Sequence, residues 1–326
     1  MSILLDVKDL HVQFSNRLGE VRAVSGVNFQ LKEGEILGIV GESGCGKSTL
    51  AKALVHLLPS HSAKMQGEIL FQGLDLLKCK EEELLSIRGK EIGFIFQDPM
   101  TSLNPTMKIG EQIIEGYLKH HPHISKKEAL AYAAELLATV GISQPSERLF
   151  EYPHTMSGGM RQKVTIALAL ASRPKILIAD EPTTALDATI QAQILSFISS
   201  LQKLQNTSII LITHDLSVVA GFCDRVIVMY AGQIVEVAPV EELFYDPKHP
   251  YTQRLLKTIP RIDLPKDTVL SPIEGSPPLL HMPWKGCAFA PRCLDALPHC
   301  KTAEPPLYTM KNECSSRCWL REKESS

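Results

Sequence analysis

The sequence predicts an α/β protein: a core sheet, an antiparallel β subdomain, a helical insertion and a carboxy-terminal extension rich in proline and cysteine. Largely apolar runs at 36–40, 92–96 and 176–179 are typical of strands buried on both faces of a parallel sheet. Residues 104–160 change to helical periodicity, which predicts an insertion between strands of that sheet. Thirteen of the 21 prolines lie between 239 and 306, which predicts an extended segment.

The antiparallel subdomain is predicted from residues 3–35, which read as short strands. Leu10, Val12 and Phe14 alternate with polar residues, and the same alternation recurs over 27–31. A period of two residues is that of a strand with one buried face. On this pattern alone, Phe14 reads as a core residue.

The run at 36–40 leads into a glycine-rich loop, and a helix-compatible segment follows the loop. This strand–loop–helix order, with the spacing of Gly41, Gly44, Gly46 and Lys47, predicts a P-loop that binds nucleotide phosphates, so the core sheet is expected to be a P-loop sheet. Glycines let successive N–H groups face phosphate oxygens, and the helix adds its positive end. The loop residues expected to bind nucleotide are Gly41, Ser43, Gly44, Cys45, Gly46, Lys47, Ser48 and Thr49.

Individual side chains of the loop have separate expected roles. Lys47 reaches the β- and γ-phosphates, and the Ser48 hydroxyl ligates magnesium. Cys45 is expected to contribute its backbone, with a reactive thiol in a positive loop as the alternative. The competing interpretation, a glycine-rich turn with a chance lysine, is disfavoured by the flanking strand and helix.

The second apolar run ends at Gln97, where a parallel strand delivers groups to a ligand. Gln97 is therefore a candidate to contact a metal or a water, and a polar strand terminus is the alternative. Within the insertion, Ser125 and Glu128 have capping-box spacing, which predicts a helix start. Ser157, Gly158 and Gly159 begin a further helix and so form a second candidate anion-binding end, a weak signal when taken alone.

The third apolar run ends in Asp180 and Glu181. Asp180 is placed to hold magnesium together with Ser48, and Glu181 to take a proton from an attacking water. Asp187 is expected to cap the next helix. A last buried strand ends near His214, which is expected to face the nucleotide. Solvated acids and a structural histidine are the alternatives.

Composition limits the possible functions. The chain has 326 residues, 44% of them hydrophobic, and a formal net charge of −2. That charge gives no general attraction to nucleic acid or acidic lipid. The amino terminus lacks the basic region of a secretory signal, and no apolar run approaches the roughly 18 residues of a membrane span. We expect a soluble chain whose membrane role, if any, comes through a partner.

Two domains are expected, at 1–245 and 246–326, with the helical insertion at about 104–160. Five of the eight cysteines lie after residue 286. Disulfides rarely persist in the cytosol, where a P-loop ATPase works, so the clustering predicts a metal site. The gaps of five and six residues between Cys287, Cys293 and Cys300 fit neither common zinc knuckles nor common ferredoxin runs, so the metal stays open.

The ordered set of motifs resembles the ATP-binding cassette proteins over about residues 3–260. The resemblance implies a head-to-tail dimer in which ATP lies between the P-loop of one subunit and the Ser157–Gly159 signature of the other. By position, Phe14 would stack on adenine, and Gln97 would sense magnesium and the attacking water. Glu181 would be the general base, and His214 would hold the γ-phosphate. The implied catalytic residues are Gln97, Glu181, His214 and Lys47.

The signature completes the implied nucleotide site. Ser157, Gly158 and Gly159 would close on the partner's γ-phosphate, and Asp187 would link the two sites of the dimer. Met160 departs from the glutamine usual in the family, so the signature keeps its hydroxyl and backbone N–H groups but lacks the amide side chain. The change puts only the tuning of closure in doubt.

Finer features resemble the ATPases of dipeptide/oligopeptide importers. They are the run from Phe96 to Pro105, the segments 229–232 and 249–253, and the cysteine-bearing tail. The resemblance implies partners: an identical or paralogous ABC ATPase subunit, two transmembrane permease subunits gripped by segment 97–110 and the helical insertion, and indirectly a substrate-binding protein. It implies a peripheral place on the cytoplasmic face of the inner or plasma membrane.

Some members of this subfamily carry a 4Fe-4S cluster in the tail. By position its ligands would be Cys287, Cys293, Cys300 and Cys318, with Cys314 spare. Zinc, or thiols without metal, are the alternatives. A structural role is favoured over electron transfer.

The function expected is ATP hydrolysis that powers import of di- or oligopeptides, with ATP and Mg²⁺ as the ligands. A nickel or other small-solute importer is the first alternative. A soluble ABC ATPase acting on nucleic acid or ribosomes is disfavoured by the single cassette and the missing basic arm, and an iron–sulfur redox protein leaves the nucleotide motifs unexplained.

Overall fold

The structure is a computed structural model that describes residues 2–16, 19–183, 187–259, 272–278, 280–281 and 284–324. The chain divides into two compact units. The first comprises Met1–Ser2, Lys32–Glu35 and Lys78–Ile212, and the second comprises Ile3–Leu31, Ile36–Leu77 and Thr213–Ser326. Both combine strands with helices, which confirms the predicted α/β fold.

Three parallel strands form the sheet of the first unit. They are β6 (Ile92–Ile95), β7 (Ile176–Asp180) and β8 (Ser208–Thr213), with β7 in the middle. Every residue of β7 and β8 is buried, as the continuous apolar runs predict. The carboxyl ends of β6 and β7 therefore lie at one edge of this sheet, and they carry Gln97 and Asp180.

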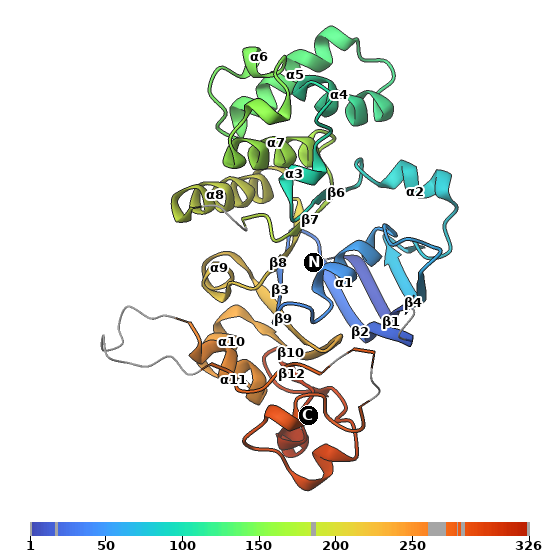
Figure 1. Ribbon diagram of the computed structural model, residues 1–326, viewed down its shortest axis with the longest axis vertical. Coiled ribbons are helices and arrows are strands. Elements are labelled where there is room, and N and C mark those ends of the chain that lie inside the picture. Colours follow the sequence, from blue (N-terminus) through green and yellow to red (C-terminus); the bar gives the residue numbers. More distant parts are fainter. Residues whose placement is uncertain are drawn as a thin grey trace. The chain divides into compact units, whose positions relative to one another are not determined.

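The helical insertion of the first unit is confirmed, and Figure 1 shows its helices gathered in green. It contains α4 (Ile109–His120), α5 (Lys126–Thr139), α6 (Pro145–Arg148) and the 3₁₀ turn η1 (Pro153–Thr155). The unit also contains helices α2 (Glu81–Ile87), α3 (Pro99–Ser102), α7 (Gly158–Leu170) and α8 (Ala188–Gln205).

Helix α5 begins where the capping box predicts. The Ser125 hydroxyl accepts a bond from the Glu128 N–H at 3.3 Å, and the Glu128 carboxylate accepts one from the Ser125 N–H at 2.9 Å. The serine hydrogen bonds lower the pKa of Glu128. Gly141 follows the helix with φ of 74°, a left-handed conformation that glycine adopts at low cost.

The second unit contains the antiparallel subdomain, with strand order β2-β1-β4-β5. These strands are β1 (Ile3–Asn16), β2 (Gly19–Lys32), β4 (Ala63–Phe71) and β5 (Leu74–Asp75). Val12 and Val27 are buried, as the alternation predicts. Phe14, opposite Ala63 on β4, remains partly exposed and is not the core residue that the pattern alone suggests.

A second sheet segment of this unit holds the strand before the P-loop. Its order is β11-β12-β10-β9-β3, where β3 (Ile36–Val40) and β9 (Arg225–Tyr230) are parallel. Strand β10 (Gln233–Pro239) is antiparallel to β9 and to the short β12 (Ser315–Ser316), which pairs with β11 (Tyr308–Thr309). The carboxy-terminal extension thus adds two strands to a sheet, a feature that its proline-rich composition did not predict.

The helices of the second unit are short. They are α1 (Lys47–Leu54), α9 (Leu216–Phe222), α10 (Val240–Tyr245) and α11 (Pro250–Lys257), with 3₁₀ turns η2 (Ala290–Arg292), η3 (Pro298–Lys301) and η4 (Trp319–Glu324). His249 caps α11, because its Nδ1 accepts a bond from the Tyr251 N–H at 3.0 Å. Burial lowers the pKa of His249 to about 3, so the imidazole is neutral near pH 7.

Ser125→Ala removes the cap of α5. We expect a loss of about 1 kcal/mol in the free energy of unfolding, measured by urea denaturation. Lys127→Ala, on the exposed face of the same turn, is the control and should stay within about 0.5 kcal/mol of the parent. Equal effects of the two changes would contradict the capping assignment.

His249 makes stability depend on pH. Its folded pKa of about 3 lies below the ordinary value of 6.5, so the unfolded chain binds the extra proton between these values. Stability is therefore lost as pH falls through this window, by up to about 1.4 kcal/mol per pH unit. His249→Asn, which retains a capping oxygen, should flatten the dependence, whereas His61→Asn on the surface should leave it unchanged. The measurement is the free energy of unfolding as a function of pH. Parallel curves for the parent and both variants would contradict the assignment of this pH dependence to His249.

Candidate functional site

The glycine-rich loop of the second unit connects β3 to α1. Gly41, Gly44 and Gly46 have φ of 152°, 79° and 104°, a region that other residues rarely adopt. A Cβ atom at Gly41 would collide with the Met229 carbonyl oxygen, and one at Gly46 would collide with the Ala23 carbonyl oxygen. Glycine at these two positions is thus required by both conformation and space.

Lys47 begins α1 and is buried. Its ammonium donates to the Gly41 carbonyl at 2.7 Å and to the Glu42 carbonyl at 3.0 Å. Burial raises the pKa of the Cys45 thiol, although the neighbouring Lys47 opposes the shift, so the thiol is protonated at neutral pH. This contradicts the alternative of a reactive Cys45 and leaves its backbone as the part that can bind. Ser48 and Thr49 follow Lys47 in the first turn of α1.

In the first unit, the structure brings two predicted catalytic residues together. The Gln97 side-chain amide donates to a Glu181 carboxylate oxygen at 2.9 Å. Asp180 ends strand β7 and is buried, and Glu181 is also buried. Glu181 has φ of 48°, and its N–H donates to the Ile212 carbonyl at 2.9 Å. Strained backbone held by its surroundings is characteristic of active sites.

The signature residues and Asp187 also come together in the first unit. They line a cavity of about 480 Å³, whose wall includes Ser157, Gly158, Gly159, Met160 and Asp187. Ser157 caps α7 by accepting the Met160 N–H at 3.3 Å. Asp187 caps α8 by accepting the Ile190 N–H at 2.9 Å, as predicted. The exposed amino-terminal end of α7 therefore borders an open cavity suited to an anion.

The predicted site residues fall in both units. Phe14, the glycine-rich loop and His214 belong to the second unit, where His214 follows β8 and is exposed. Gln97, the signature, Asp180, Glu181 and Asp187 belong to the first.

Sequence reasoning missed two residues that hold the glycine-rich loop from the carboxy-terminal region. Tyr251 accepts a hydrogen bond from the Glu42 N–H at 2.9 Å. Arg292 contacts the Glu42 carboxylate through two nitrogens, at 2.6 and 3.0 Å. The available signal was chemical: a carboxylate inside an anion-binding loop needs a compensating cation.

The metal centre predicted for the cysteine tail finds no support in the described residues. Among the residues that the structure describes, no three His, Cys, Asp or Glu side chains lie close enough to hold a metal ion. Burial raises the pKa of the Cys287 and Cys293 thiols, and that of Cys318 to about 11. Cys300 and Cys314 are also buried. The structure therefore gives no support to the iron–sulfur cluster or to zinc.

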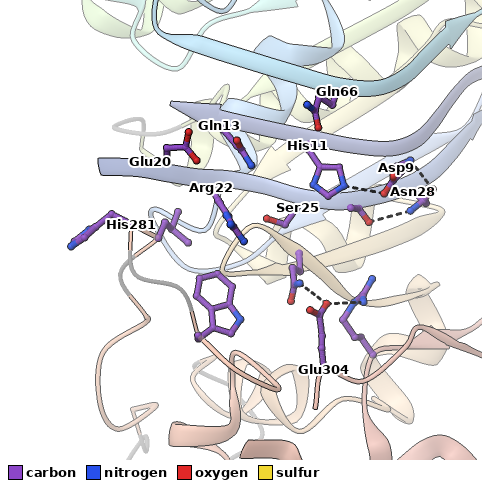
Figure 2. Close-up of a pocket in the computed structure, with 15 residues that line it drawn as sticks. Asp9, His11, Gln13, Glu20, Arg22, Ser25, Asn28, Gln66, His281 and Glu304 are labelled. Atoms are coloured by element: carbon purple, nitrogen blue, oxygen red, sulfur yellow. Dashed lines mark hydrogen bonds and ion pairs between the residues drawn. The ribbon is translucent and has the colours of Figure 1, made fainter. Parts of the chain in front are cut away.

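The second unit also contains a polar cavity of about 780 Å³ that none of the predicted site residues lines (Figure 2). Glu304 accepts hydrogen bonds there from Gln233 at 2.7 Å and from Arg317 at 3.2 Å. On its β1 side, His11 and Asp9 form a pair at 3.0 Å. These groups are already paired with each other, so the cavity does not replace the glycine-rich loop as the candidate site.

Within the described part of the chain, no helix combines the length and apolar character that crossing a bilayer requires.

Comparison with known proteins agrees with this geometry. The family described as "ABC transporter" matches residues 24–184, and "Oligopeptide/dipeptide transporter, C-terminal region" matches residues 235–300. The oligopeptide transport ATP-binding protein OppD of Bacillus subtilis (strain 168) is 54% identical over 97% of this chain and 88% of its own length. The dipeptide transport ATP-binding protein DppD of the same strain is 49% identical, covering 99% and 96%.

Solved structures give the same result. The dimeric post-hydrolysis structure of the ATP-binding cassette MJ0796, bound to ADP and Pi, aligns with a TM-score of 0.66 and 28% identity. The alignment covers 72% of this chain and 98% of that one. Given the glycine-rich loop, the paired Gln97 and Glu181, and these relatives, the chain belongs to the ABC transporter family, in the group of oligopeptide and dipeptide transport ATP-binding proteins.

Proposed function

We propose that the protein is the ATP-hydrolysing subunit of an ABC importer of dipeptides or oligopeptides. The observation that carries this proposal is its near full-length similarity to transport ATP-binding proteins, extending through the carboxy-terminal region characteristic of peptide transporters. The glycine-rich loop adds the physical basis for binding a nucleotide, because its glycines free backbone N–H groups for phosphate oxygens.

The loop binds the triphosphate by exchanging its internal bonds. The Lys47 ammonium donates to two loop carbonyls. When ATP binds, the ammonium donates to the β- and γ-phosphates in their place. The backbone of Gly41, Ser43, Gly44, Cys45, Gly46, Ser48 and Thr49 surrounds the phosphates. Phe14, partly exposed on β1, supplies a face for adenine.

Glu181 is the general base of the proposed hydrolysis. Its carboxylate takes a proton from the attacking water, and the Gln97 amide, 2.9 Å away, orients both the carboxylate and that water. His214 holds the γ-phosphate. Catalysis of this type consists mainly of positioning and charge neutralisation, for which a buried and restrained acid is suited.

Mg²⁺ is the expected metal of the reaction. The Ser48 hydroxyl and the Asp180 carboxylate are hard oxygen donors, the ligand type that Mg²⁺ prefers, so the residues present fit it. When bound, the ion would neutralise charge on the β- and γ-phosphates.

We propose that the signature of this chain binds the nucleotide that is held by the glycine-rich loop of a second ATPase subunit. Ser157, Gly158 and Gly159 present a hydroxyl and free helix N–H groups beside an open cavity, as the γ-phosphate of a partner requires. Asp187, on the wall of the same cavity, would connect this closure to the neighbouring site. The partner is an identical or a paralogous ABC ATPase.

The membrane partners are proposed to be two permease subunits, with a substrate-binding protein acting through them. Met100 lies in segment 97–110 and Phe150 in the helical insertion, the two segments predicted to grip a permease, and their side chains are 62% and 60% exposed. A permease docked on these segments would cover both apolar side chains, which would favour binding. The protein would sit peripherally on the cytoplasmic face of the membrane, with residues 1–245 as the ATPase domain and 246–326 as the importer-specific extension.

Glu181→Gln tests the chemistry. We expect steady-state ATP hydrolysis to fall by roughly 100-fold or more, because a general base is lost, while ATP binding stays near the parent value. Phosphate release and nucleotide affinity are the two measurements. Glu91→Gln is the control, because Glu91 forms an ion pair with Lys175 at 3.0 Å. This variant should hydrolyse ATP at the parent rate. Near-normal turnover by Glu181→Gln would refute the base assignment.

Capture from detergent-solubilised membranes tests the partners. The parent protein should retain two integral membrane proteins, and Met100→Asp with Phe150→Asp should weaken retention by roughly tenfold, because a charge replaces an apolar contact. Tyr245→Asp, which changes an 89% exposed residue of α10, is the matched control. Failure of the parent to retain permease subunits, with nucleic acid or ribosomes recovered instead, would overturn the importer proposal. Equal retention by all variants would show that Met100 and Phe150 are not part of the docking surface.

A further inference from the structure

Glu42 is an acidic residue inside a loop that binds phosphates. It lies directly after Gly41, and its side chain is 24% exposed. A carboxylate at this position repels a bound triphosphate, and the repulsion is strong where burial limits screening by water. The loop therefore needs a device that neutralises Glu42 or holds its carboxylate in place.

Arg292 supplies that device from a position 250 residues away. Two of its nitrogens contact the two Glu42 carboxylate oxygens, at 2.6 and 3.0 Å, in the paired geometry that makes arginine–carboxylate contacts strong. The Arg292 side chain is 5% exposed. Its other donors are also used, by the carbonyls of Glu274 at 2.9 Å and Ile273 at 3.1 Å. Arg292 is thus held rigidly and directed at one partner.

The backbone of Glu42 has a separate anchor. Its N–H donates to the Tyr251 hydroxyl at 2.9 Å, and Tyr251 is fully buried at the start of α11. The aromatic rings of Tyr251 and Tyr230 pack at 4.7 Å, and the Tyr230 hydroxyl contacts Arg292 at 3.3 Å. Both anchors of Glu42 therefore come from the segment after residue 245 and are connected to each other.

The two anchors also affect Lys47. The Lys47 ammonium donates to the carbonyl of Glu42 at 3.0 Å, so a fixed Glu42 backbone fixes one acceptor of the lysine that the phosphates must recruit. A displaced Glu42 would change both the local charge and the starting position of Lys47.

We propose that Arg292 and Tyr251 are positioning residues of the phosphate-binding loop, and that Arg292 neutralises Glu42 so that the loop accepts a triphosphate. The inference rests on the proposed function only in taking ATP as the ligand. It gives the carboxy-terminal extension a direct part in nucleotide affinity.

Arg292→Ala is the principal test, with Mg-ATP and Mg-ADP affinities measured by titration of the full-length protein. We expect the Kd for ATP to rise by about tenfold, equivalent to about 1.4 kcal/mol, and the Kd for ADP to rise less, because ADP carries less charge. The loss should be larger at low ionic strength. The kcat at saturating ATP should change by less than about twofold, because uniform binding is lost and not transition-state contacts.

Glu42→Gln in the Arg292→Ala background distinguishes electrostatics from packing. Removing the carboxylate should restore ATP affinity to within about threefold of the parent, which a purely structural role of Arg292 would not produce. Arg317→Ala is the matched control, because Arg317 pairs with Glu304 in the same region and does not contact the loop. It should bind ATP normally. Where Arg292→Ala does not fold, Arg292→Gln provides the same comparison.

Three outcomes are decisive. Unchanged ATP affinity in the Arg292 variant overturns the inference, and so does a loss that Glu42→Gln fails to restore. Failure of the parent protein to bind ATP would instead overturn the proposed function, so the two failures are distinguishable.

Discussion

The structure of the nucleotide site depends on the absence of side chains at two positions of one loop. At Gly41 and Gly46, the space that a Cβ atom would need is filled by the backbone carbonyls of Met229 and Ala23. These carbonyls come from β9 and β2, so the loop packs against the backbone of both sheets of the second unit. Because backbone atoms shift less readily than a flexible side chain, these two contacts restrict the conformations that the loop can adopt.

The same loop contains a buried lysine, Lys47, and a partly buried acid, Glu42. Lys47 is satisfied by carbonyls that lie within six residues of it, whereas Glu42 depends on groups from a distant part of the chain. Local bonds of the first kind can be exchanged for phosphate bonds at little cost, since they involve only the loop itself. The contacts of Glu42 with Tyr251 and Arg292 need not break during that exchange, so they hold the backbone of the loop in position.

Local signals in the sequence predict most of the fold. The glycine spacing, the Ser125 capping box and the buried strand before Asp180 each act over a few residues, and the structure confirms all three. The pairing of Gln97 with Glu181 spans 84 residues and follows from sheet topology, because the two residues come shortly after the ends of the adjacent parallel strands β6 and β7. The contact between Arg292 and Glu42 spans 250 residues, and no periodicity or motif encodes it. For the cysteines, spacing indicates candidate ligands only, and the described residues include no group of three that could hold a metal ion.

The carboxy-terminal extension is therefore better understood as part of the ATPase than as an appendage. Its strand β12 pairs with β10, and the buried Glu236 of β10 accepts the N–H groups of Lys248 and His249 at 2.6 and 2.8 Å. Burial raises the pKa of Glu236, and these bonds oppose that rise, so the carboxylate is tied to the segment that leads into α11. Satisfied buried polar groups are costly to disrupt, which makes the path from β10 to Tyr251 rigid. Because this path ends on Glu42, it connects the carboxy-terminal region directly to the glycine-rich loop.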